Sequence, residues 1–252
     1  MPGWCTSGDG LEDSPEVEVL CGGVNTKTPQ HAALWRQGHL LHFGFQEAPS
    51  ELNVTGRALL ENALVYIARF RDDRPIATTP SVFVDPNYPR PRAWLLQALD
   101  NPKAKASQMT AYLGKELAEQ LAAQPLAELR SWLQARRGFL AAGPKDGLLV
   151  VDADAEWFGT ALDAPGFVPA LVAAAKEPER QARALALLAR RVPQGPGASA
   201  TAADWQAFVS ANRDWLFFSD AGGQRWYVDP LARQRKTPSA ELRGPRRATP
   251  GR

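Results

Sequence analysis

The sequence predicts an α+β fold that is mainly helical. We expect a small α/β piece, the edge of a partial three-layer sheet, followed by two similar helix–helix–helix–hairpin units. Three observations predict this: short β-prone runs precede residue 46, apolar residues recur at helical spacing over residues 52–70, and a later segment recurs after 76 positions, as Pro102 and Pro178 illustrate (178 − 102 = 76).

Composition is typical of a globular protein. Of 252 residues, 44% are hydrophobic and 22% are charged, and this length allows one large domain or two or three small ones. The net charge of +2 produces no global field that would attract nucleic acid or an anionic membrane. No stretch approaches the ~18 consecutive apolar residues of a spanning helix. We therefore expect no membrane span.

The first domain is predicted over residues 1–72. After a loose lead-in, residues 16–24 form a strand, and residues 32–36 and 39–45 form a hairpin around Gln37–Gly38. Residues 1–13 lack the basic-then-apolar order of a signal peptide, which leaves the compartment open.

A helix follows the hairpin, and Ser50 is its expected N-cap. We expect Gly56 to allow close packing against a sheet. The apolar face predicted for this helix consists of Leu52, Leu59, Leu60, Ala63, Leu64, Ile67 and Phe70.

A Pro-rich linker is predicted over residues 73–92, with a short strand at residues 81–84. The first repeat then covers residues 93–155 and the second covers residues 156–232. A basic, disordered tail is predicted over residues 233–252. We expect this tail to be solvated and do not expect nucleic acid as a partner.

Each repeat contains three predicted helices and a β-like ending. The second repeat ends in a hairpin with its turn at residues 220–223, and the first ends in a weaker version. Val151–Asp152 and Val228–Asp229 match if one residue is deleted.

The polar residues form no recognisable catalytic, cofactor or metal site. His39 and His42 are three apart, so in a strand they point to opposite faces and cannot share a metal ion. Asp152 and Asp154 lack the further oxygen ligands of a calcium loop, and we interpret them as capping or turn residues. Ser219 is not flanked by glycines as a nucleophile elbow would be, which favours turn capping.

Aromatic residues are concentrated near the C-terminus, and two interpretations remain open. They form either a surface that binds a protein or a carbohydrate, or the core beneath a small hairpin, which the pattern favours. The candidate binding residues are Trp205, Trp215, Arg225, Trp226 and Tyr227.

Residues 39–45 (HLLHFGF) and 52–70 (LNVTGRALLENALVYIARF) resemble the last strand and closing helix of ThuA-like, class I glutamine amidotransferase-like domains. Residues 212–229, continued by 241–245, resemble a segment of uncharacterised, often exported proteins of planctomycete-type bacteria. The amidotransferase-like pattern falls on Gly56, Arg57, Leu59, Leu60, Asn62 and Ala63.

In such a domain further strands, and any Cys or Glu of its site, would precede the resembling segment. The sequence before residue 16 is too short to contain them. We expect either the C-terminal part of a longer protein or a relative that has lost its site. Two functions follow: a non-catalytic binding or scaffold protein, or an accessory segment of a ThuA-like hydrolase or carbohydrate-active protein encoded upstream.

Overall fold

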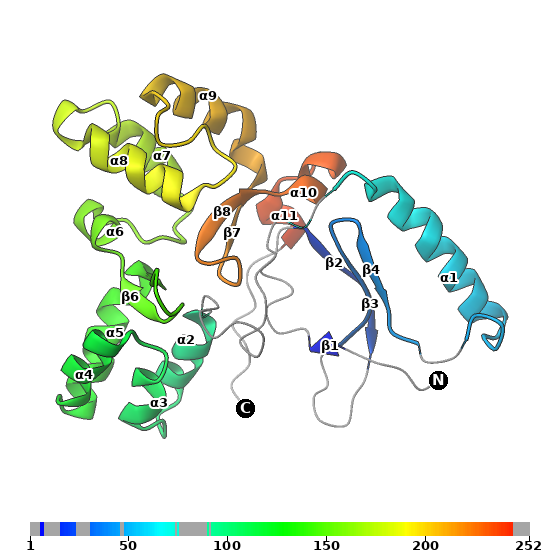
Figure 1. Cartoon of the computed structure of the whole chain (residues 1–252), viewed down its shortest axis with the longest axis horizontal. Helices are drawn as coiled ribbons and strands as arrows, with labels where there is room; N and C mark the ends of the chain where they lie inside the picture. The colour runs from blue at the N-terminus through cyan, green and yellow to red at the C-terminus, as the bar shows by residue number, and fades with distance from the viewer. Residues whose placement is uncertain are drawn as a thin grey trace. The chain divides into compact units, whose positions relative to one another are not determined.

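The computed structural model of the chain describes residues 6–7, 16–23, 31–45, 48–73, 75, 90 and 92–243. The chain forms two compact units, Met1–Thr78 and Thr79–Arg252, called here the N-terminal and C-terminal units (Figure 1). Helices predominate and the sheets are small and antiparallel, which confirms the predicted mainly helical α+β class. Most of the predicted linker 73–92, with its strand at 81–84, lies outside the described residues.

The N-terminal unit is built on an antiparallel sheet in which β3 is central. β2 pairs with one edge of β3, whereas β1 and β4 pair with successive parts of the other edge. The turn between β3 and β4 contains Gly38 with φ of 54°, a conformation that glycine adopts readily. The predicted strand and hairpin are confirmed, and the bounds are β1 Thr6–Ser7, β2 Val17–Gly23, β3 His31–Gln37 and β4 Leu40–Phe43.

Helix α1 (Val54–Ile67), extended by the 3₁₀ turn η1 (Ala68–Phe70), follows the sheet. Its N-cap is Asn53, whose Oδ1 accepts a hydrogen bond of 2.8 Å from the Gly56 amide. The prediction of Ser50 as N-cap is therefore wrong. The helix begins three residues later because Asn53 has extended backbone and a short side chain that reaches the free amide of the first turn.

One face of α1 packs on the sheet. The guanidinium of Arg36 lies 3.6 Å from the centre of the Phe70 ring, and the Tyr66 hydroxyl donates to Glu18 at 2.6 Å. Leu64 was predicted on this buried face and is instead exposed. A Cβ on Gly56 would meet the Leu52 and Asn53 side chains at 3.3–3.4 Å, so the nearest neighbours of Gly56 are residues just before its own helix and not the sheet against which close packing was predicted.

The first repeat of the C-terminal unit contains five α-helices and one hairpin among the described residues. Its elements are α2 Arg92–Asp100, α3 Ala106–Thr110, α4 Lys115–Ala122, α5 Leu126–Arg136, η2 Arg137–Phe139, β5 Leu140–Ala142, β6 Leu149–Val151 and α6 Ala153–Phe158. Helices α4 and α6 were not predicted.

The second repeat has the same ending. Helix α5 and helix α9 are both 11 residues long, and each is followed by a 3₁₀ turn, a hairpin and a short helix that ends in a left-handed residue, Gly159 or Lys236. The elements are α7 Phe167–Ala174, α8 Pro178–Arg191, α9 Ala202–Asn212, η3 Arg213–Trp215, β7 Leu216–Ser219, β8 Arg225–Val228 and α10 Pro230–Arg235. The repeats differ where α3 and α4 stand in place of the single helix α8.

The chain continues into α11 (Ser239–Arg243). The prediction that residues 233–252 are disordered is therefore wrong for residues 233–235 and 239–243, which are helical. Ser239 holds α11 against the second repeat, because its buried hydroxyl donates to the Trp215 carbonyl and lies within hydrogen-bond distance of Asp229. Residues 244–252 lie outside the described part.

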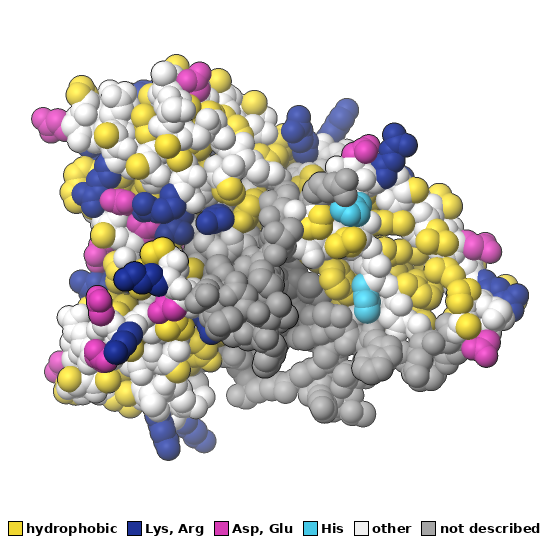
Figure 2. Space-filling model, viewed as in Figure 1, with side chains coloured by type: hydrophobic (Ala, Val, Ile, Leu, Met, Phe, Trp, Pro, Cys, Tyr) yellow, Lys and Arg dark blue, Asp and Glu magenta, His cyan; other side chains and the backbone are white. Residues whose placement is uncertain are grey.

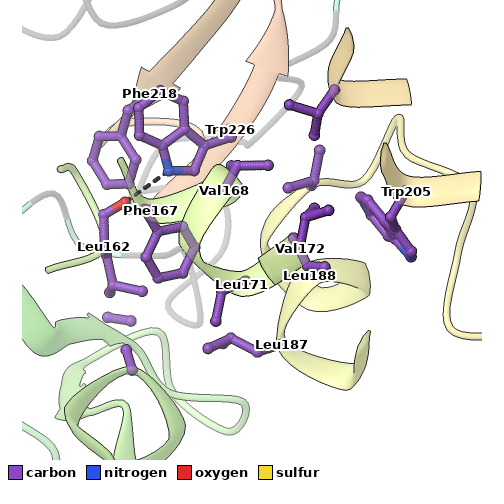
Figure 3. Packing of buried hydrophobic residues seen from close by; sticks show 14 residues of the cluster. Leu162, Phe167, Val168, Leu171, Val172, Leu187, Leu188, Trp205, Phe218 and Trp226 are labelled. Atoms are coloured by element: carbon purple, nitrogen blue, oxygen red, sulfur yellow. Dashed lines mark hydrogen bonds between the residues drawn. The ribbon is translucent and has the colours of Figure 1, made fainter. Parts of the chain in front are cut away.

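Each repeat has a buried cluster of apolar side chains, and the cluster of the second repeat extends into the first. The cluster of the second repeat includes Ala141 and Ala155 from the first, so the repeats share a packed boundary. Figure 3 shows Trp226 at one end of this cluster and Trp205 at the other. The cluster of the first repeat is leucine-rich and consists of Leu95, Leu99, Met109, Leu113, Leu121, Leu129, Leu133, Leu140 and Leu149.

Candidate interaction surface

The aromatic side chains near the C-terminus are core residues. Trp205, Trp226 and Tyr227 are buried, so they cannot contact a partner of the folded protein, and the core interpretation is confirmed for them. Figure 3 shows Trp205 and Trp226 within the apolar cluster. The indole Nε1 of Trp226 donates to the Leu162 carbonyl at 2.7 Å, and the Tyr227 hydroxyl donates to the Gly222 carbonyl at 2.7 Å. Their polar groups are thus already used within the chain.

The other two candidates of this group do not complete a surface. Arg225 is exposed, and Trp215 is half-buried on η3. The structure places Arg225, Trp226 and Tyr227 along one strand, where neighbouring side chains point to opposite faces. A joint binding role for all five residues therefore has no geometric support in the folded chain.

Asp152 is the centre of a buried charged network between α6 and α8. Its carboxylate accepts a hydrogen bond from Nε of Arg191 at 3.0 Å and one from Arg190 at 2.9 Å. It also accepts from the amides of Asp154 and Ala155, both at 3.1 Å, which makes it the N-cap of α6 and confirms its predicted capping role.

The electrostatics of this network favour the ionised carboxylate. Burial alone would raise the pKa of Asp152, but the positive charge and hydrogen bonds of Arg191, the Ala155 amide and the charge of Arg190 outweigh it, so the pKa is lowered. Asp154 behaves in the same way, since Arg190 and Arg183 lower its pKa against the effect of burial. An ionised carboxylate that already accepts several hydrogen bonds and has a lowered pKa is a poor general base. We therefore assign this network the structural role of holding the two repeats together.

A second buried network also joins the two repeats. Arg92 at the start of α2 donates to Asp220 at 3.2 Å and to Asp163 at 3.0 Å. Gln224, at the end of the β7–β8 turn, donates to the Asp220 carboxylate at 3.0 Å and accepts from the Ala142 amide at 2.8 Å.

The backbone of Gln224 has φ of 54°, which is uncommon for a residue with a side chain. The contacts to Asp220 and Ala142 hold this conformation in place. The nearby Ser219 hydroxyl accepts from the Gly222 amide at 2.9 Å, which confirms its predicted role in the turn.

His39 and His42, two of the three histidines of the chain, have separate contacts. The ring nitrogen Nδ1 of His39 is 2.7 Å from the Asp73 carbonyl, whereas His42 stacks on Trp35 with ring centres 5.6 Å apart. Within the described part of the chain, no three His, Cys, Asp or Glu side chains are grouped as metal ligands would be.

Exposed apolar side chains are concentrated in the N-terminal unit, on α1 and on the strands β2 and β4, and supply its candidate interaction residues. Figure 2 shows hydrophobic side chains gathered on the visible face of this unit, beside the histidines. The exposed large hydrophobic residues of the N-terminal unit are Val19, Leu20, Leu40, Val54, Leu64 and Val65. Those described in the larger C-terminal unit are Trp94, Leu126 and Trp157.

The exposed apolar face of α1 was not predicted, although the sequence contains a signal for it. Residues 63–67 of α1 read Ala-Leu-Val-Tyr-Ile, so apolar residues occur on both sides of the helix. Apolar residues on more than one side of a helix are typical of a helix that contacts other protein on more than one side. On α1 only the face toward the sheet is covered within the described residues.

Comparison of the chain with protein-family models, with curated proteins and with solved structures gives no match. None of the helices in the described ranges has the length and apolar character that crossing a bilayer requires.

Proposed function

We propose that the chain is a non-catalytic binding or scaffold protein whose N-terminal unit binds another protein. The observation that carries this proposal is the set of exposed apolar side chains on α1, β2 and β4. Large apolar patches are uncommon on proteins that work alone and mark interaction sites. The repeats of the C-terminal unit are held together by buried ion pairs and a shared core, which suits a scaffold.

The chemistry of the described polar residues supports a binding role. The buried carboxylates Asp152 and Asp220 are held by arginines, and the Ser219 hydroxyl is used in a turn. Catalytic acids and nucleophiles need a free reactive atom that faces a substrate. The polar atoms of these groups are instead used in hydrogen bonds and ion pairs within the chain.

The proposal is tested by affinity purification of the full tagged chain from its own cells. We expect a partner protein in near-stoichiometric amount, lost with Leu40→Glu or Val65→Glu and kept with the matched C-terminal-unit variant Leu126→Glu. Circular dichroism of each variant checks that the fold is intact. Absence of any partner, or a partner equally retained by all three variants, would overturn the proposal.

The second candidate function is that of an accessory segment of a ThuA-like hydrolase or carbohydrate-active protein encoded upstream. It is supported by the sheet, which carries α1 on one face while Leu40 and Val19 are exposed, as in part of a layered domain. The buried Gly56 and Ala63 belong to the amidotransferase-like pattern. An open reading frame that continues upstream of Met1 with further strand–helix units supports this function, and a nearby in-frame stop codon argues against it.

A further inference from the structure

The outer face of α1 carries an apolar stripe with one charge at its centre. The stripe consists of Val54, Ala58, Glu61 and Val65 and continues to Ala68, the first residue of η1, and all five are exposed. Val54 is 86% exposed and Val65 is 71% exposed, which is unusual for valine in a helix that already packs on a sheet. Leu64, 56% exposed, widens the stripe on one side.

The spacing of the stripe is that of a helix-pairing seam. Its members follow one another by four, three, four and three residues, the alternation that places side chains along one line of an α-helix facing another helix. Helix α1 is 14 residues long, or about 21 Å at ~1.5 Å per residue, so four turns are available for such a contact.

The negative charge of Glu61 limits which partner surfaces can cover this seam. Within the described residues, no cation forms an ion pair with its carboxylate, and it stands between Ala58 and Val65. A partner that covers the valines also removes water from Glu61, which is costly unless the partner supplies a positive charge.

A second copy of the chain does not meet this requirement. Pairing of two α1 helices in parallel register, or antiparallel about the centre of the stripe, places Glu61 against Glu61. Like charges opposed in an apolar contact disfavour that dimer.

We propose that the outer face of α1 binds an amphipathic helix of another protein whose apolar seam carries a Lys or Arg opposite Glu61. This inference rests on the proposed binding function and names the partner's chemistry and its place of contact. The apolar side chains supply the contact area, and the Glu61 pair fixes the register.

The test uses the full chain and two synthetic helical peptides of three heptads. Both have Leu and Ala along the seam and balanced charges elsewhere, and they differ only in Lys or Glu at the central seam position. Fluorescence anisotropy is expected to show binding of the Lys peptide and at least about tenfold weaker binding of the Glu peptide. With Glu61→Lys the preference is expected to reverse.

Matched variants localise the binding. Val65→Glu is expected to abolish binding of the Lys peptide, whereas Leu126→Glu leaves it unchanged. Equal binding of both peptides, binding of neither, or a preference that Glu61→Lys does not reverse would overturn the inference. Sedimentation equilibrium tests whether a second copy of the chain binds this face instead. Self-association that strengthens with Glu61→Gln and disappears with Val65→Glu would assign the face to a second copy and would overturn the inference.

This inference and the proposed function fail in different ways. If neither peptide binds but a partner still co-purifies and depends on Leu40, the α1 inference is wrong and the binding function stands. If no partner co-purifies at all, the binding function is wrong whatever the peptides do.

Discussion

Asp152 and Asp229 occupy equivalent places in the two repeats. Each carboxylate accepts hydrogen bonds from two amides in the first turn of the helix that follows, α6 or α10. Each backbone amide donates to the last residue of the preceding 3₁₀ turn, Phe139 at 2.8 Å or Trp215 at 2.7 Å. The equivalence extends to single hydrogen bonds, which supports duplication of one structural unit. The outer partners differ, since Asp152 binds arginines of α8 and Asp229 contacts Ser239 of α11.

We predict that Asp152→Asn lowers the free energy of unfolding by about 3 kcal/mol, because it leaves the buried Arg191 without its counter-charge. Urea unfolding followed by circular dichroism measures this change. Asp204→Asn is the matched control, because Asp204 also accepts a helix-capping hydrogen bond but is exposed. Its loss is expected to be clearly smaller, and equal losses for the two variants would contradict a special role of the buried pair.

The same network predicts a loss of stability in acid. The pKa of Asp152 and that of Asp154 are lower in the folded chain than the ordinary value of 3.8. A lowered pKa in the folded state means that the stabilisation is fully present above the unfolded pKa and is lost as the pH falls below about 3.8 through the folded pKa.

Urea unfolding of the wild type and Asp152→Asn between pH 6 and pH 2.5 checks this expectation. The stability difference between them should be constant above pH 5 and should narrow below about pH 4, because only the wild type protonates at this position. A difference that does not change over this range would show that Asp152 does not titrate with a lowered pKa.

The sequence predicted the elements whose signals are local. Repeated apolar and proline positions located α2, α3 and α5 in the first repeat and α7, α8 and α9 in the second, and glycine turns located hairpins. The cap of α1 was misplaced because Ser50 and Asn53 are both good N-caps and only the folded chain selects between them. Helix α6 was missed because six residues carry little periodicity, although Asp152 before it is a typical cap.

The candidate surface depended on information that is not local. Whether Leu64 or Ala63 of α1 faces the sheet depends on the rotation of the helix, which is set by contacts such as Tyr66 with Glu18. The aromatic residues left core and surface both open, since a buried Trp205 and an exposed tryptophan have the same appearance in a sequence. Tertiary packing, rather than residue type, decides between core and surface in both cases.

We predict that Arg92 and Asp220 are energetically coupled. Their side chains are nearly inaccessible and form an ion pair of 3.2 Å that joins α2 to the second hairpin. Removal of either partner leaves the other charge buried, so the first substitution should cost more than the second. A double-mutant cycle with Arg92→Ala and Asp220→Ala should give a coupling energy of about 1–3 kcal/mol, and additive losses would show that the pair is independent.

The last prediction concerns Gly195, which lies against Trp205 in the loop before α9. A Cβ on this residue would lie 2.3 Å from the ring of Trp205, which fills the core and cannot move without displacing its neighbours. Gly195→Ala is therefore expected to lower the free energy of unfolding by about 1–3 kcal/mol through overpacking.

Gly166→Ala is the matched control for this change, because a Cβ there meets no atom within 4 Å and the backbone has a negative φ of −83°. Its cost should be limited to the smaller preference for glycine over alanine at a helix N-cap. Thermal unfolding of both variants compares the two, with tryptophan fluorescence as a second reading because the indole of Trp205 would have to shift. If Gly195→Ala unfolds like the wild type with unchanged fluorescence, the close approach of this glycine to Trp205 is wrong.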